Sequence, residues 1–133
     1  MPRTIRALPW PPNFKESEFN RGGLSPIPNT RKDAMKTVAW ILQTYRASIF
    51  DSRAITITNA YRTPADLARL VRAGYNPALN SYHFDGQAAD FVVQGLSAQE
   101  VQRRLRAAGW SGGLGTGSNF THIDLGNKRE FTY

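Results

Sequence analysis

Both histidines of the chain lie in short segments whose residue types suit a single metal site. The segments are SYHFDGQAAD at residues 81–90 and THIDLG at residues 121–126. A catalytic zinc ion takes three protein ligands from histidine and carboxylate side chains and keeps a further position for water. His83, Asp90 and His122 would supply that set. The chain has no cysteine, which excludes a thiolate zinc site and a cysteine nucleophile.

Each of these residues also has an ordinary structural explanation. Asp90 lies in an apolar run, where an unpaired carboxylate is costly, so its partner is either a metal ion or an ion pair or hydrogen-bonding group. A lone histidine such as His122 is more often a hydrogen-bonded structural residue than a ligand. Gly86 permits a turn between His83 and Asp90, and Ala88 removes bulk nearby, so the small residues and the two ligand types are explained together.

The elements that position these residues can be predicted from periodicity. Asn29 or Thr30 is expected to cap a helix that runs to about residue 49 on one apolar stripe. A strand is predicted at 55–58 and a second helix from Thr63 and Pro64, with inward-facing residues that include Val71. Another strand is predicted at 88–93. Ser97 and Glu100 form a capping box for a third helix, which ends before position 109.

The last part of the chain is predicted to hold two extended segments. Residues 112–117 indicate a strand or extended loop in close backbone contact, and residues 120–125 a final strand. His122 and Asp124 share one face of that strand because side chains alternate. The element order favours an α+β domain with a small, mostly antiparallel sheet and helices packed against it. We expect residues 1–28 to form an irregular arm packed on the body and residues 29–133 a single domain.

The motifs resemble a known zinc peptidase family. The pattern S-x-H-x-x-G-x-A-x-D followed by H-x-D is similar to that of D-alanyl-D-alanine carboxypeptidases, related dipeptidases and phage L-alanyl-D-glutamate endolysins. Residues 55–64 (ITITNAYRTP) resemble the family's upstream strand and its Ser-Gly-Tyr-Arg-(Ser/Thr)-Pro segment. Residues 14–19 are similar to the opening of the small, single-domain branch, so the resemblance covers roughly residues 14 to 126.

This resemblance implies both a fold and a set of roles. The fold would be hedgehog/D-Ala-D-Ala peptidase-like, with zinc held by His83, Asp90 and His122. Arg62 would bind or polarise the peptide substrate, and Ser81 would line the site. The structural alternative for Arg62 is an ordinary surface salt bridge. The implied substrate is the stem peptide of bacterial peptidoglycan, cleaved by a carboxypeptidase or by an endopeptidase of the endolysin type.

The chain departs from the family pattern at two places. Several members carry an acid three residues before the second histidine, where this chain has Asn119. An amide cannot accept a proton from water, so we expect Asp124, or another carboxylate such as Asp85, to be the general base. Asp124 has a second reading, as an acceptor that orients a histidine ligand. The other departure is Asn59-Ala60 in place of the usual Ser-Gly.

The composition indicates which kind of partner the protein binds and where it acts. The 133 residues fit one domain, and 17 lysines and arginines against 10 acids give a net charge of +7. That charge favours an anionic partner such as a cell wall. No secretory signal and no membrane span are visible, so we expect a protein made in the cytoplasm that acts at the bacterial cell wall, as a phage lysin or virion-associated enzyme does.

Three functions compete at this point. The first is a zinc metallopeptidase that acts on peptidoglycan peptides. The second is a catalytically weak or inactive zinc-bound module of the same fold, which binds the wall or phage virion partners, as Asn119 would permit. The third is a nucleic-acid binder. It is supported only by scattered basic and aromatic residues, without a recognisable motif, and is therefore unlikely to be correct.

Overall fold

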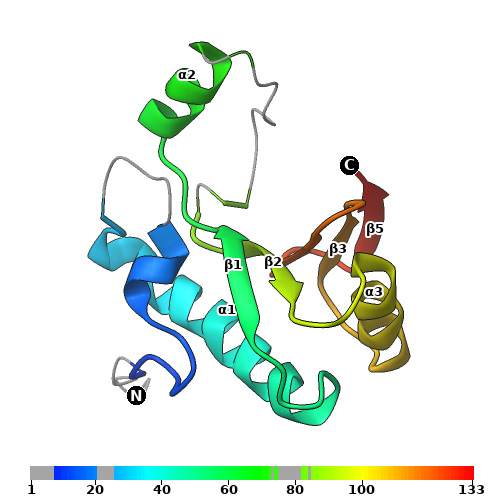
Figure 1. Ribbon diagram of the computed structural model, residues 1–133. Helices are drawn as coiled ribbons and strands as arrows, with labels where there is room; N and C mark the ends of the chain where they lie inside the picture. The colour runs from blue at the N-terminus through cyan, green and yellow to red at the C-terminus, as the bar shows by residue number, and fades with distance from the viewer. Residues whose placement is uncertain (1–7, 21–25, 73, 75–81, 84) are drawn as a thin grey trace.

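A five-stranded sheet forms the centre of the protein (Figure 1). The computed structural model describes residues 8–20, 26–72, 74, 82–83 and 85–133. Within these ranges the elements are η1 (Glu16–Asn20), α1 (Asn29–Ser48), β1 (Ile55–Asn59), α2 (Pro64–Arg72), β2 (Ala88–Val93), α3 (Ala98–Ala107), β3 (Gly113–Thr116), β4 (Thr121–Asp124) and β5 (Arg129–Thr132). The strand order is β1-β2-β4-β3-β5, and only the β3–β5 pair is parallel. The predicted α+β class with a mostly antiparallel sheet is confirmed.

The two faces of this sheet differ in chemistry because side chains alternate along each strand. One face carries Ile57, Phe91 and Ile123, which are fully buried. It belongs to a core cluster that α1 and α3 complete, with Met35, Val38, Leu42, Val101 and Leu105. The other face carries the polar residues. In the β2–β4 register Asp90 lies opposite His122 and Ala88 lies opposite Asp124. The sheet therefore separates the core from the candidate site.

Two of the three α-helices described here begin at the N-cap residue predicted from the sequence. The Ser97 hydroxyl accepts a hydrogen bond from the backbone N–H of Glu100 at 3.1 Å, as the capping box predicts. Thr63 caps α2 in the same manner, since its hydroxyl accepts from the N–H of Asp66 at 3.1 Å. The predicted cap of α1 was wrong. Its N-cap is Pro28, without a side-chain hydrogen bond, and Asn29 already lies in the helix.

The α2 helix stands clear of the sheet, at the top of Figure 1. Val71, which was predicted to face inward, is 55% exposed. The prediction failed because an apolar stripe says only that a helix has an apolar side, whereas the placement of α2 leaves this position without a covering layer. None of the helices within the described ranges combines the length and the apolar run needed to cross a membrane.

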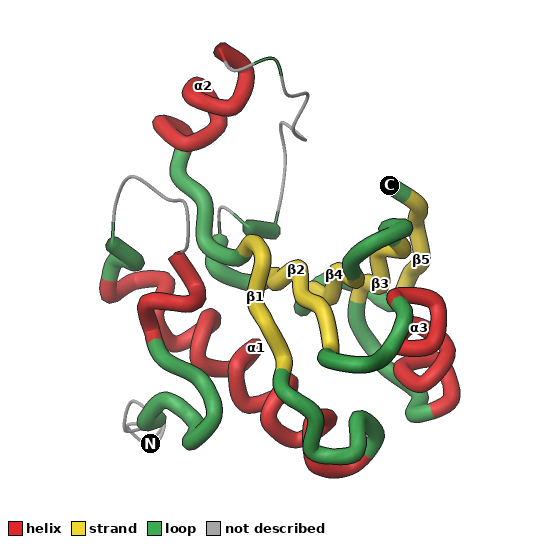
Figure 2. Tube along the Cα trace, viewed as in Figure 1, coloured by secondary structure: helices red, strands yellow, loops and turns green. Residues whose placement is uncertain are grey.

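Both ends of the described chain pack onto the body. Phe14 and Phe19 are buried, and the carbonyl of Phe19 accepts a hydrogen bond from the N–H of Tyr61 at 2.8 Å. The division between an arm and a domain at residue 28 stays a prediction. At the other end, β4 is not the last strand. The chain turns at 125–128 and adds β5 at the edge of the sheet, beside β3 (Figure 2).

One side chain of α3 fastens the connection between β3 and β4. The buried Gln102 amide nitrogen lies 3.1 Å from the carbonyl oxygen of Gly117 and 3.3 Å from that of Phe120. It is also 3.3 Å from the hydroxyl of Thr121, the first residue of β4. This buried amide therefore fixes the strand that carries His122.

The Gln102→Met variant should lower the free energy of unfolding by about 1–3 kcal/mol, because it leaves buried carbonyl groups without a donor. The matched control is Gln99→Met on the exposed side of the same helix, where the amide makes one contact of 3.4 Å, with the carbonyl of Ser118. Urea denaturation of both variants measures the difference. Equal stability of the two variants would contradict the fastening role of Gln102.

Candidate metal site

His83, Asp90 and His122 meet on the polar face of the sheet. One ligand atom from each lies within 4.8 Å of the others, and all three residues are buried. Asp90 Oδ1 is 2.8 Å from His122 Nδ1 and 3.4 Å from His83 Nε2. The first and last of the three predicted ligands, His83 and His122, are 39 positions apart in the sequence. They are brought together with Asp90 by the β2–β4 register and by the turn at Gly86, which has a φ of 67°.

The orientation of His83 is fixed from outside the cluster. Its Nδ1 lies 2.6 Å from the carbonyl oxygen of Ala60. A carbonyl only accepts, so Nδ1 carries the proton and Nε2 presents its lone pair to the cluster. The segment before this contact adds a second support, since the Asn59 amide donates to Asp90 Oδ2 at 3.5 Å. The two residues that depart from the family pattern therefore each hydrogen-bond to a candidate ligand: Asn59 to Asp90, and the Ala60 carbonyl to His83.

His122 is oriented in the same way by Asp124. Its Nε2 lies 2.7 Å from Asp124 Oδ2, so Nε2 donates and Nδ1 points at Asp90. Burial alone lowers the pKa of His122, but the hydrogen bonds with Asp124 and Asp90 outweigh it and the pKa is raised. Burial raises the pKa of Asp90, and hydrogen bonds from both histidines more than reverse that, so Asp90 stays ionised. The 2.8 Å contact between His122 Nδ1 and Asp90 is therefore made through a proton, and a metal ion could take the place of that proton.

Asp124 has all of its hydrogen-bonding capacity engaged. Its Oδ1 accepts from the N–H of Gly126 and from Arg129, both at 2.9 Å. Its Oδ2 accepts from His122 and from the second nitrogen of Arg129, the latter also at 2.9 Å. A carboxylate offers about four acceptor sites, and here each is occupied. Burial raises the pKa of Asp124, and the hydrogen bonds from His122 and Arg129 lower it further than burial raises it. These contacts support the orienting role of Asp124 rather than the general-base role.

Two glycines of β3 allow side chains from its neighbours to meet above it. Gly113 is paired with Asp124 on one side and Arg129 on the other, and Gly115 is paired with His122 and Phe131. A Cβ atom on Gly115 would lie 2.7 Å from the Tyr133 ring, 2.8 Å from the His122 Cβ and 2.9 Å from the Phe131 ring. The close approach predicted for residues 112–117 is therefore made by side chains from β4 and β5.

The remaining predicted residues have different positions. The backbone N–H of Arg62 donates to the carbonyl of His83 at 3.1 Å, so this half-buried residue is tied to a candidate ligand. Ser81 lies outside the described residues. Asp85 is about half exposed and lies 3.6 Å from Arg31. Asn119 is exposed in the connection between β3 and β4.

Sequence reasoning missed two residues at this site, Arg129 and Tyr133. Arg129 holds Asp124 and also lies over the rings of Tyr82 and Phe131, at 5.0 and 5.1 Å from their centres. The Tyr133 hydroxyl is 3.1 Å from His122 Nδ1. The signal that could have found them is the alternation Arg129-x-Phe131-x-Tyr133 after the Gly126-Asn127 turn, which is typical of a half-buried strand.

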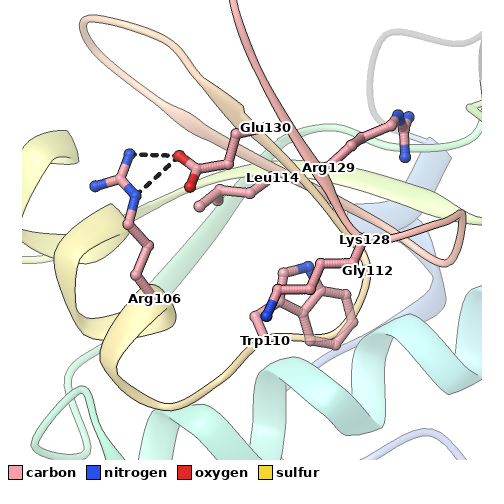
Figure 3. Close-up of a pocket in the computed structure, with 7 residues that line it drawn as sticks. All are labelled: Arg106, Trp110, Gly112, Leu114, Lys128, Arg129 and Glu130. Carbon is pink, nitrogen blue, oxygen red and sulfur yellow. Dashed lines mark hydrogen bonds and ion pairs between the residues drawn. The ribbon is translucent and has the colours of Figure 1, made fainter.

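A separate pocket of about 320 Å³ lies on the opposite side of β3, where Leu114 points. Figure 3 shows the Arg106–Glu130 ion pair on one side of this pocket and Trp110 on another, with the Arg129 guanidinium turned away. The three candidate ligands are not in its lining. Arg129 is the residue that this lining shares with the surroundings of the cluster, through its hydrogen bonds to Asp124.

A buried set of two imidazoles and one carboxylate on a small α+β sheet is an arrangement that mononuclear metallohydrolases use. Comparison with protein families agrees with it. The model of the peptidase M15 family matches residues 13–124, and the chain belongs to this family. The family predicted from the motifs is thereby confirmed. Residues 125–133, which include Arg129 and Tyr133, lie beyond the matched range.

The chain also matches curated proteins, over part of its length. The chain is 31% identical over 81 residues to peptidoglycan L,D-endopeptidase MepK of Escherichia coli strain K12, and the same figures hold for the protein of that name from Shigella flexneri. The match covers 59% of this chain and 44% of each relative. The chain thus spans less than half the length of the curated relatives it matches.

The Asp124→Asn variant should bind zinc about 10- to 100-fold more weakly, because it loses the charged acceptor that orients His122. Asp33→Asn is the matched control, since Asp33 is exposed on α1 and remote from the cluster. Competition with a chromophoric chelator measures both affinities. If Asp124→Asn binds zinc as tightly as Asp33→Asn, Asp124 does not orient the ligand.

Proposed function

We propose that this protein is a zinc-dependent peptidase that cleaves the stem peptides of bacterial peptidoglycan. The observation that carries the proposal is the buried meeting of His83, Asp90 and His122, with the inner ring nitrogen of each histidine turned toward Asp90. Membership of the peptidase M15 family supports peptidase chemistry. The printed name of the relatives, a peptidoglycan endopeptidase, supports the substrate class.

The donor set fits zinc. Two neutral imidazole nitrogens and one ionised carboxylate are usual ligands of a catalytic zinc ion, and His83 Nε2, an Asp90 oxygen and His122 Nδ1 would hold it. When bound, zinc lowers the pKa of water and polarises a carbonyl group. The residues around the ligands keep them in place: Ala60 fixes the ring of His83, and Asp124 fixes that of His122.

Substrate binding is assigned to Arg62 and Ser81. Arg62 follows β1, and its backbone N–H is hydrogen-bonded to the carbonyl of His83. Its side chain therefore leaves the backbone next to the cluster. Its planar fork of donors suits a substrate carboxylate or the oxygen that gains charge during peptide hydrolysis. Ser81 precedes His83 by two positions and is proposed to line the same site.

A zinc-binding module without turnover is the second candidate. One observation favours it: the usual acidic position is Asn119, and the Asp124 carboxylate has its acceptor sites filled. Such a module would bind the cell wall or a phage virion. The net charge of +7 supports adsorption to an anionic wall under either candidate, and action there as a phage lysin or virion-associated enzyme is part of the proposal.

Mass spectrometry of purified muropeptides incubated with zinc-loaded protein tests the proposal directly. We expect products that are absent with His122→Ala and with chelator, and that return when zinc is restored. Release of D-alanine identifies a carboxypeptidase, whereas a split stem or cross-link identifies an endopeptidase of the endolysin type. A protein that binds one zinc ion per chain and yields no product would contradict the peptidase proposal and favour the module.

Replacing Arg62 tests the substrate-binding role. Arg62→Met should lower kcat/KM for the muropeptide by roughly 10- to 100-fold, because a charged hydrogen bond to the substrate is lost. Arg103→Met is the control, since Arg103 pairs with Glu100 on the surface of α3. Steady-state rates on the same muropeptide measure both variants. An Arg62→Met protein as active as the control would show that Arg62 makes only structural contacts.

A further inference from the structure

The hydroxyl of Tyr133, the residue directly after β5, lies beside the candidate metal cluster. It lies 3.1 Å from His122 Nδ1, the ring nitrogen that faces Asp90. The opposite ring nitrogen is occupied by Asp124. The hydroxyl therefore approaches the cluster from the side where ligands converge and not from the side that holds the imidazole in place.

The position of the Tyr133 ring is defined by packing. The ring centre is 5.0 Å from that of Phe120 and 5.6 Å from that of Phe131, in tilted or edge-on geometry. Gly115 beneath it leaves the space that the ring needs. The backbone N–H of Tyr133 donates to the carbonyl of Thr116 at 3.4 Å, which continues the β3–β5 pairing. The residue as a whole is 60% exposed, so it lies at the surface of the cluster rather than in the core.

Charged groups around the hydroxyl come from several elements of the sheet. Burial and the Asp90 carboxylate raise the pKa of Tyr133, while the Arg62 guanidinium lowers it, and Asp124 and Arg129 add smaller opposing effects. A tyrosine hydroxyl carries its proton at neutral pH and can therefore donate a hydrogen bond. Arg62 and Tyr133 follow strands at opposite edges of the sheet, with Asp90 and His122 on the strands between them.

A metal ion held by His122 Nδ1 would occupy the nitrogen that the hydroxyl faces. Nδ1 lies 2.8 Å from Asp90 Oδ1 and 3.1 Å from the Tyr133 hydroxyl, so these two oxygen atoms flank the position at which the nitrogen would hold the ion. With the nitrogen so engaged, the O–H group would stand beside the metal position, where an oxygen atom of the substrate could accept its hydrogen bond.

We infer that Tyr133 is a catalytic residue whose hydroxyl donates a hydrogen bond to the substrate carbonyl oxygen at the cluster. This inference rests on the proposed peptidase function. As the carbonyl carbon becomes tetrahedral its oxygen gains negative charge, and a donor placed there stabilises that charge. The proton stays on Tyr133, so no group is transferred. The role complements that of Arg62, which approaches from the β1 side.

The Tyr133→Phe variant tests the inference, with Tyr45→Phe on α1, on the core side of the sheet, as the matched control. Three quantities are measured on zinc-loaded protein: kcat and KM for a muropeptide, affinity for zinc, and affinity for acetohydroxamate. Acetohydroxamate brings a negatively charged oxygen to an open zinc position without needing turnover. We expect kcat to fall roughly 100-fold, as for loss of an oxyanion donor, while KM and zinc affinity stay within about threefold.

We also expect acetohydroxamate to bind Tyr133→Phe roughly tenfold more weakly than Tyr45→Phe, since a hydrogen bond to a charged oxygen is lost. Unchanged kcat and hydroxamate affinity would overturn the inference. A loss of zinc affinity as large as the loss of kcat would also overturn it, because Tyr133 would then act through the metal ligands. If wild-type protein cleaves no muropeptide, the proposed function fails, and the hydroxamate titration still decides whether Tyr133 contacts a bound oxygen.

Discussion

The candidate site depends on one kind of interaction, a hydrogen bond to the outer nitrogen of each imidazole. The Ala60 carbonyl fixes the tautomer of His83, and the Asp124 carboxylate fixes that of His122. Because both outer nitrogens must donate, both inner nitrogens present lone pairs beside Asp90. Two lone pairs and a carboxylate in a buried space repel one another, so the 2.8 Å contact between His122 Nδ1 and Asp90 requires a proton, and a metal ion could take the place of that proton.

On the polar face of the sheet, β3 carries glycines where other strands carry side chains, and this lets side chains of β4 and β5 meet. Glycine at positions 113 and 115 removes the side chains that would otherwise separate β4 from β5. Arg129 can therefore reach across the strand to Asp124, and the aromatic side chains of β5 can reach His122. The opposite face has conventional apolar packing under α1 and α3. The same five strands thus provide an apolar core on one side and a polar cluster on the other.

The fold class and the meeting of His83, Asp90 and His122 in one cluster could be predicted from sequence, whereas the surroundings of these residues could not. His83, Asp90 and His122 were recognisable because a charge in an apolar strand and two histidines in glycine-containing segments are unusual. The alternation that contains Arg129 indicates a strand but does not show which strand it pairs with, and the role of Arg129 depends on the parallel pairing that joins β5 to β3. The two readings of Asp124 could be separated only by its contacts, since sequence does not show which acceptor sites are filled.

The most direct test of this account is an anomalous difference map at the zinc absorption edge, from crystals of zinc-loaded protein. The account predicts one zinc ion bonded to His83 Nε2, an oxygen of Asp90 and Nδ1 of His122, with Nε2 of His122 still bonded to Asp124. Zinc bound through Nε2 of His122, or bound away from the three residues, would contradict the claim that the outer hydrogen bonds arrange the ligands.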